Sequence, residues 1–149
     1  PDIMSRLRNK DTASAYNLRF TILTAARSGE SRGALWSEID TQAKVWTIPA
    51  ERMKAGREHK VPLCDEAIEI LAIMKTWNIN NSDIVFIGGR EKCLSDVAIN
   101  KTLHAINPNV TVHGFRSTFR VWGAETTSTP SAVLELALAH VNQNEVEAA

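Results

Sequence analysis

The sequence predicts an α+β domain that is mostly helical and contains one small antiparallel β-sheet. Apolar residues recur at helical spacing over most of the chain, whereas one segment, KVWTIPA, alternates as a strand does. The 149 residues suit one domain, and no repeat, low-complexity tract or Pro/Gly-rich linker divides them. A composition of 44% apolar and 23% charged residues excludes a disordered chain, a fibrous repeat and a disulfide-stapled scaffold. We therefore expect residues 1–149 to form a single domain.

Capping residues and apolar stripes set the positions of the expected helices. Asp11 or Thr12 caps the first helix, Asp65 and Ser95 cap later ones, and Pro130 suits the first turn of another. The expected helices cover 11–25, a short stretch that reaches Leu35, 65–77, 95–106, 113–125 and 131–139, and a last one opens at 144.

The expected sheet is an antiparallel hairpin over 44–63 with its turn at Gly56. In its first strand, Trp46 and Ile48 face the same side, and IVFI at 84–87 predicts a short buried strand or extended segment. The tryptophans lie in apolar patterned segments, which favours core positions over base-stacking ones: Trp36, Trp46, Trp77 and Trp122.

Charge is distributed unevenly, although the formal net charge is zero. Residues 1–120 hold 17 basic and 13 acidic side chains, a net charge of +4, and no Lys or Arg follows Arg120. The segment ERMKAGREHK concentrates basic side chains, and it is either a solvated charged turn or a patch that faces DNA phosphates. Its candidate DNA-binding residues are Arg52, Arg57, His59 and Lys60.

Targeting signals and metal motifs are missing from the sequence. No stretch approaches the roughly 20 apolar residues of a membrane span, and PDIMSRLRNK lacks a signal-peptide core. Cys64 and Cys93 form neither a CxxC pair nor a metal-ligand spacing. We expect a reduced, cytoplasmic setting, no membrane partner and no metal site.

Several residues suit phosphate chemistry, but each also has a purely structural interpretation. Arg27 follows an apolar helix, where an arginine offsets the helix dipole or pairs with a neighbour such as Glu30. His113 and Arg116 lie three residues apart, on one face of a helix near its start. Backbone N–H groups and the helix dipole favour an anion at that position, and an arginine can hold a phosphate there. A buried histidine beside a solvent-directed arginine explains that pair equally well.

Two further candidates are individually weak. Lys54 stands near the hairpin tip, where lysines ordinarily increase solubility. His140 ends an alanine-rich helix, where a histidine serves as a C-terminal cap.

The order and local context of these residues resemble the catalytic domain of the tyrosine recombinases, especially integrases of phages and genomic islands. The motifs are TAARSGE, RMKAGREHKVPL, HGFRSTFRVWGAE and LALAH, and the resemblance runs from Leu18 to Ala149. It implies the fold of DNA breaking-rejoining enzymes and site-specific DNA integration and excision. Strand cleavage would pass through a 3′-phosphotyrosyl intermediate, which needs neither a metal nor a nucleotide cofactor.

The resemblance also assigns a catalytic set, which is Arg27, Lys54, His113, Arg116 and His140, with Glu30 to orient neighbouring side chains. Arg27 and Arg116 would stabilise the negative charge that builds on the phosphate. Lys54 would protonate the leaving 5′ oxygen. His113 would act as an acid or base, and His140 would bond a phosphate oxygen.

The nucleophile is the one departure from the family pattern. The family places its tyrosine shortly after the LAH motif, whereas the only tyrosine here is Tyr16, inside the first expected helix. We therefore expect this chain to lack its nucleophile and to be inactive in cleavage. Amino-terminal arm-binding and core-binding domains would precede Pro1, as in full-length relatives, and the chain alone should bind DNA weakly.

The implied partners are double-stranded attachment sites, other integrase protomers in a tetrameric synapse, and excision and host DNA-bending factors in the bacterial nucleoid. Two alternatives remain open from the sequence. A DNA-binding accessory module without catalysis would show a stop codon soon after Ala149. A type IB topoisomerase would relax supercoiled DNA without needing a recombination site.

Overall fold

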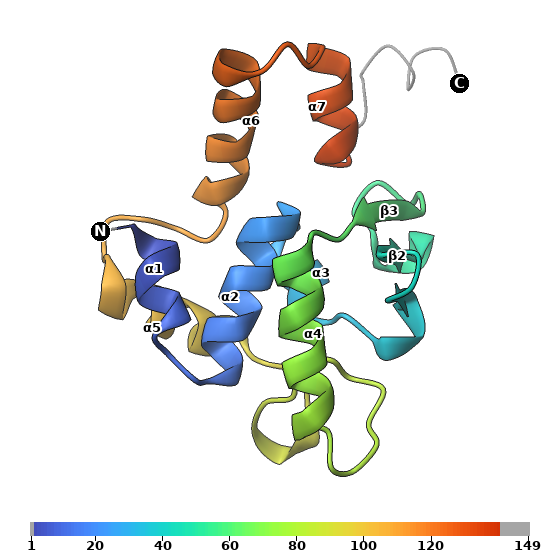
Figure 1. Cartoon of the computed structure of the whole chain (residues 1–149), viewed down its shortest axis with the longest axis vertical. Helices are drawn as coiled ribbons and strands as arrows, with labels where there is room; N and C mark the ends of the chain where they lie inside the picture. Colours follow the sequence, from blue (N-terminus) through green and yellow to red (C-terminus); the bar gives the residue numbers. More distant parts are fainter. Residues whose placement is uncertain (1, 141–149) are drawn as a thin grey trace.

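The structure, a computed structural model, describes residues 2–140 (Figure 1). Its helices are α1 (Ile3–Arg8), α2 (Ala13–Thr24), α3 (Ser28–Arg32), α4 (Asp65–Trp77), α5 (Asp96–Ile106), α6 (Gly114–Thr126) and α7 (Ser131–Ala137). Its strands are β1 (Ile39–Asp40), β2 (Val45–Ile48) and β3 (His59–Pro62). Short 3-10 turns cover Trp36–Glu38, Ala50–Arg52 and Gly89–Glu91. The prediction of a mostly helical domain with a small antiparallel sheet is confirmed.

Helix α2 is the centre of the body and packs against α1, α4 and α5 (Figure 1). Its start matches the sequence prediction, because the Thr12 side chain accepts a hydrogen bond from the Ala15 N–H at 3.2 Å. Its end is set by Ala25, which adopts the left-handed conformation at φ 53°. The chain then turns directly into α3, so that the short helix expected to reach Leu35 begins at Ser28 and ends at Arg32.

The sheet has the order β1-β2-β3, and both pairings are antiparallel. Trp46 and Ile48 of β2 are fully buried, as the alternating pattern predicts. Strand β1 was not expected, because its two residues carry no alternation. IVFI forms an extended segment held by isolated bridges, one of them between Leu35 and Ile84, and not a regular strand.

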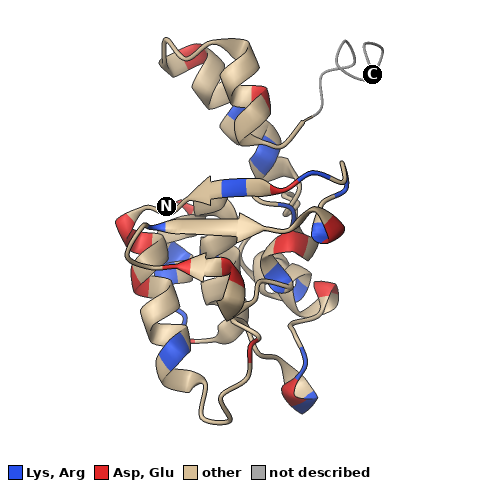
Figure 2. Cartoon of the chain, turned by 90° about the vertical axis from the view of Figure 1, so that its right-hand side faces the viewer, with Lys and Arg blue, Asp and Glu red and all other residues tan. Residues whose placement is uncertain are grey.

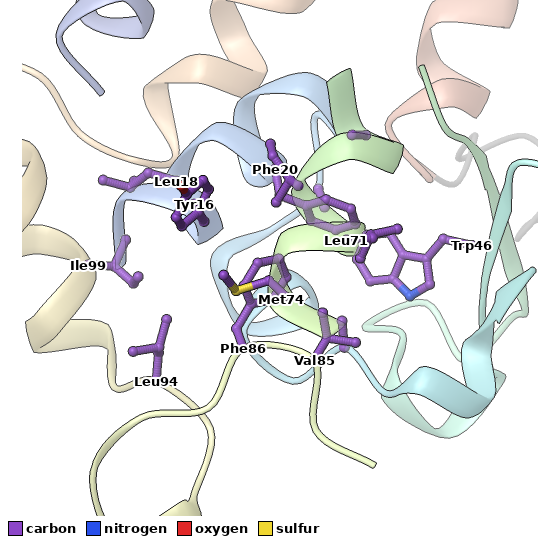
Figure 3. Close-up of a cluster of buried hydrophobic side chains, with 14 of the residues drawn as sticks. Tyr16, Leu18, Phe20, Trp46, Leu71, Met74, Val85, Phe86, Leu94 and Ile99 are labelled. Carbon is purple, nitrogen blue, oxygen red and sulfur yellow. The ribbon is translucent and has the colours of Figure 1, made fainter. Parts of the chain in front are cut away.

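The core lies between α2, α4, the sheet and the 84–94 segment (Figure 3). The Phe20 ring lies 5.2 Å from the rings of both Trp46 and Phe86. The core prediction is wrong for two tryptophans, since Trp77 is 41% and Trp122 is 55% exposed. Trp122 is exposed because α6 stands away from the body with α7 and buries only part of its surface (Figure 1).

Helices α6 and α7 form a hairpin above the sheet (Figure 1). Gly123 permits their close approach, since a Cβ atom there would lie 2.5 Å from a Leu134 methyl carbon. The helix expected from 144 lies outside the described residues. Within 2–140, no helix is long and apolar enough to cross a membrane.

Candidate active site

A hollow of about 360 Å³ is lined by Arg27, Lys54, Ala55, Ala139 and His140. The three functional side chains come from the start of α3, the β2–β3 connection and the residues after α7. Further Lys and Arg residues lie along β3 and along the loop that leads into it, and β3 is the strand nearest α6 and α7 (Figure 2). The fold thus gathers residues that are more than a hundred positions apart in the chain.

Arg27 is held in place by Glu30. The Arg27 N–H donates to Glu30 Oε2 at 3.1 Å, and Arg27 Nη1 donates to Oε1 at 3.0 Å. Glu30 is buried, whereas the Arg27 side chain is 27% exposed, so its guanidinium still reaches the hollow. Glu30 therefore fixes the position of the Arg27 guanidinium.

Lys54 extends from the turn between β2 and β3 and is exposed. The turn closes at Gly56, whose φ of +67° is readily adopted only by glycine. The backbone therefore brings Lys54 to the hollow, which the residues that follow α7 also line.

Arg116 lies behind the hollow and does not line it. Its side chain is 4% exposed, with Nη1 donating to the Ala25 carbonyl at 2.5 Å and Nη2 to the Leu138 carbonyl at 2.6 Å. Arg116 Nη2 also lies 3.4 Å from His140 Nε2. Burial lowers the pKa of Arg116, the positive charge of Arg27 lowers it further, and Glu30 opposes the shift.

His113, like Arg116, is a predicted site residue that does not line the hollow. It precedes α6 and is exposed, and its carbonyl accepts a hydrogen bond from the Arg116 N–H at 3.0 Å. Its place one helical turn before Arg116 agrees with the HxxR spacing, but its side chain is not among those that line the hollow.

The candidate DNA-binding residues of the basic segment divide into Arg57, His59 and Lys60 on the one hand and Arg52 on the other. Arg57 and His59 line an adjoining hollow of about 110 Å³ together with His140, and Lys60 lies exposed on β3. Burial lowers the pKa of His59, which is the largest effect on that ring. Arg57, His59 and Lys60 therefore flank the candidate site.

Arg52 requires a correction, because its guanidinium points into the fold. Its Nε donates to Glu38 Oε2 at 2.7 Å, and its Nη2 donates to Glu38 Oε1 at 2.8 Å and to the Glu30 carbonyl at 3.2 Å. Arg52 therefore ties the hairpin to α3, a structural role that the sequence did not indicate.

Tyr16 is remote from the hollow. Its ring packs edge-on against Trp77 with centroids 5.4 Å apart, and its hydroxyl donates to Asp11 Oδ1 at 2.7 Å. This hydrogen bond is the main reason why the pKa of Tyr16 is raised. Along α2, Tyr16 precedes Ala25 by nine positions, which is about 14 Å at the helical rise per residue.

Sequence reasoning missed one residue at the site, Glu135. Its carboxylate contacts the His140 ring at 2.5 Å and Arg120 Nε at 2.6 Å. No motif marks this contact, because it depends on the turn that ends α7, where the His140 N–H bonds the Glu135 carbonyl at 2.9 Å. Among the described residues, no group of three or more His, Cys, Asp or Glu side chains is arranged to hold a metal ion.

The sequence is similar to those of known integrases. The sequence profile of the phage integrase family matches residues 1–148. Prophage integrase IntA of Escherichia coli K12 is 34% identical over 163 residues, which covers 100% of this chain and 37% of that protein. The chain therefore spans little more than a third of this relative's length.

Solved structures agree on the fold. XerA recombinase superposes with a TM-score of 0.75 at 17% identity, over 97% of this chain and 55% of that one. A lambda integrase tetramer bound to a Holliday junction gives a TM-score of 0.67 at 16% identity, over 95% and 45% of the two chains. At such identities the likeness concerns the fold.

Proposed function

Because the chain belongs to the phage integrase family, we propose that it is the catalytic domain of a tyrosine recombinase that integrates or excises a phage or genomic island. The observation that carries this proposal is the hollow where Arg27, Lys54 and His140 meet, with the Arg116 guanidinium beneath them. The resemblance seen in the sequence motifs is confirmed for family and fold.

The side chains around the hollow suit a phosphodiester. Arg27 offers a partly exposed guanidinium, and His140 a ring nitrogen, to the non-bridging oxygens on which charge builds during attack. Arg116 adds positive charge from the protein interior, where it is screened less than at the surface. A tyrosine hydroxyl would displace the 5′ oxygen of the DNA strand and form a 3′-phosphotyrosyl bond.

We propose Lys54 as the general acid. It lines the hollow together with His140, on an exposed turn between the 3-10 turn Ala50–Arg52 and β3. Its ammonium group would give its proton to the leaving 5′ oxygen, so that the cleaved strand ends in a hydroxyl. His113, at the start of α6, is proposed as an acid or base that approaches the phosphate when DNA is bound.

The proposed partners are duplex attachment sites and further integrase protomers. Lambda integrase, which shares the fold, forms a tetramer on a Holliday junction, and we extend that kind of assembly to this chain. Excision factors and host DNA-bending proteins complete the proposed assembly, in the bacterial cytoplasm. Flanking phosphates would be held by Arg57, His59 and Lys60, which border the hollow.

A strand-cleavage assay tests the proposal. A longer protein that continues past Ala149 to the tyrosine expected after the LAH motif should form a covalent adduct on a nicked attachment-site duplex. Arg27→Ala and Lys54→Ala should each reduce the adduct at least tenfold. Lys101→Ala, on α5 and outside the hollow, is the matched control.

The adduct assay and a relaxation assay on supercoiled plasmid together separate the alternatives. The 149-residue chain should form no adduct, because Tyr16 is held in the body of the fold. DNA binding by the longer protein without any adduct would indicate an accessory module. Relaxation of supercoiled DNA without a site requirement would indicate a topoisomerase, and either result would contradict the proposal.

A further inference from the structure

Glu135 joins Arg120, in the middle of α6, to His140, which follows α7. One carboxylate oxygen, Oε2, lies 2.5 Å from His140 Nδ1, and the other, Oε1, accepts from Arg120 Nε at 2.6 Å. The hydrogen bond from Arg120 lowers the pKa of Glu135 most, and the one from His140 lowers it further. The carboxylate is therefore ionised and able only to accept hydrogen bonds.

This contact determines which nitrogen of His140 carries a proton. Since an ionised carboxylate only accepts, Nδ1 must be the protonated nitrogen. On the other side of the ring, Arg116 Nη2 lies 3.4 Å from Nε2, and an arginine only donates. Nε2 is thus the nitrogen that is turned to Arg116 and the hollow, and it can donate to a phosphate oxygen only when it also carries a proton.

The carboxylate itself is firmly anchored. Arg120 Nη2 donates to Ser131 Oγ at 2.6 Å, which ties the start of α7 to the same guanidinium. Arg120 follows Arg116 by four residues, so both arginines project from the same face of α6. One helix therefore holds Glu135 through Arg120 and contacts the His140 ring directly through Arg116.

We propose that Glu135 is a positioning residue for the catalytic site: it accepts from His140 Nδ1–H and so turns Nε2 to the hollow, where the ring, once it also carries a proton on Nε2, donates to a phosphate oxygen. The proposal rests on the proposed function for its consequence in catalysis, but its geometric part stands on these contacts alone. A carboxylate behind a histidine selects the tautomer and orients the ring in other enzymes that use histidine.

The direct test is the ¹⁵N NMR spectrum of the His140 imidazole in the 149-residue chain. The wild type should show a proton on Nδ1, the nitrogen that faces the Glu135 carboxylate. Glu135→Gln retains an oxygen for Arg120 but turns an amide N–H₂ donor towards Nδ1, so the Nε2-protonated form should become the major one. Arg120→Lys, which weakens the anchor and leaves the carboxylate in place, is the matched control and should keep the wild-type tautomer as the major form.

A double-mutant cycle in the longer protein tests the consequence. Glu135→Gln should slow adduct formation roughly tenfold, the factor expected from one charged hydrogen bond. In a His140→Ala background the same substitution should have no further effect, because its influence passes through the ring. A merely structural Glu135 would lower activity equally in both backgrounds.

An unchanged His140 tautomer in Glu135→Gln would overturn the proposal, as would an undiminished effect in the His140→Ala background. A failure of this proposal can be told apart from a failure of the proposed function. If the longer protein forms no adduct at all, the NMR result on the 149-residue chain still decides whether Glu135 positions His140.

Discussion

Arg52 and Glu38 form a two-pronged ion pair at the base of the β2–β3 hairpin, with N–O distances of 2.7 and 2.8 Å. Glu38 is 6% exposed and also accepts hydrogen bonds from the Trp46 indole at 3.2 Å and the Leu35 N–H at 3.0 Å. Because Lys54 follows Arg52 by two residues, this pair fixes where the hairpin delivers its lysine.

Arg52→Ala should therefore lower the free energy of unfolding by about 3 kcal/mol, because it leaves the Glu38 carboxylate buried with a charge that has lost its arginine. Urea denaturation measures the change. Lys60→Ala on the exposed side of β3 is the control and should change stability by less than about 0.5 kcal/mol. Equal stability of the two variants would show that the ion pair contributes nothing.

Arg116→Lys should weaken the attachment of α7 to the body. A lysine ammonium cannot reproduce the forked donation to the Ala25 and Leu138 carbonyls, and a buried carbonyl left without a donor costs about 1–3 kcal/mol. We expect lower stability in urea and weaker DNA binding in fluorescence anisotropy. The loss of affinity should be equal on two unrelated duplexes, since phosphates are the same in both. A changed preference between the duplexes would contradict the assigned role.

DNA binding should depend steeply on salt. Phosphate contacts release counterions, so each contact contributes roughly −0.9 to the slope of log K against log salt. Lys54→Ala should reduce the magnitude of that slope by about 1. Lys101→Ala should leave it unchanged, because Lys101 does not line the hollow. A slope that is identical in wild type and Lys54→Ala would remove Lys54 from the DNA interface.

Stability in acid should depend on Glu66. Hydrogen bonds from Arg8 lower the pKa of Glu66 to about 2, and those from Arg19 add to the effect against the opposing influence of burial. A lowered carboxylate pKa stabilises the fold above the unfolded value near 4.5, and this contribution is lost as the pH falls towards 2. Glu66→Gln should cost about 1–2 kcal/mol at pH 7, since hydrogen bonds between charged groups are lost.

The pH profile is the distinguishing measurement. Between pH 4.5 and 2 the wild type should lose stability faster than Glu66→Gln, and the two should converge below the pKa of about 2. Parallel pH profiles for the two proteins would show that Glu66 is not the titrating group.

Local signals explain which parts of the fold could be predicted. Ser95 caps α5 by accepting from the Ala98 N–H at 3.1 Å, a contact that the sequence places three residues apart. The six residues of α1 are too few for a periodic pattern, and the helix is held by Leu7, which is fully buried.

Side-chain roles depended on partners that no local pattern reveals. Arg52 resembled its exposed neighbours in sequence, and only the distant Glu38 turned it inward. For Arg116, the motif identified the residue but not the two carbonyls that hold it beneath the hollow. The Cα positions of a helix follow from its own sequence, whereas the direction of a long charged side chain depends on the whole fold.

The central claim is that the hollow lined by Arg27, Lys54 and His140 receives a DNA phosphate. The most direct measurement is an NMR titration of the ¹⁵N-labelled 149-residue chain with a short duplex at low salt. We predict that the largest shifts fall on the side-chain and backbone signals of these three residues and of Ala139, and that Arg27→Ala abolishes them. Shifts concentrated instead around the exposed Trp77 and Ile79 at the end of α4, with the signals of the hollow unmoved, would contradict the claim.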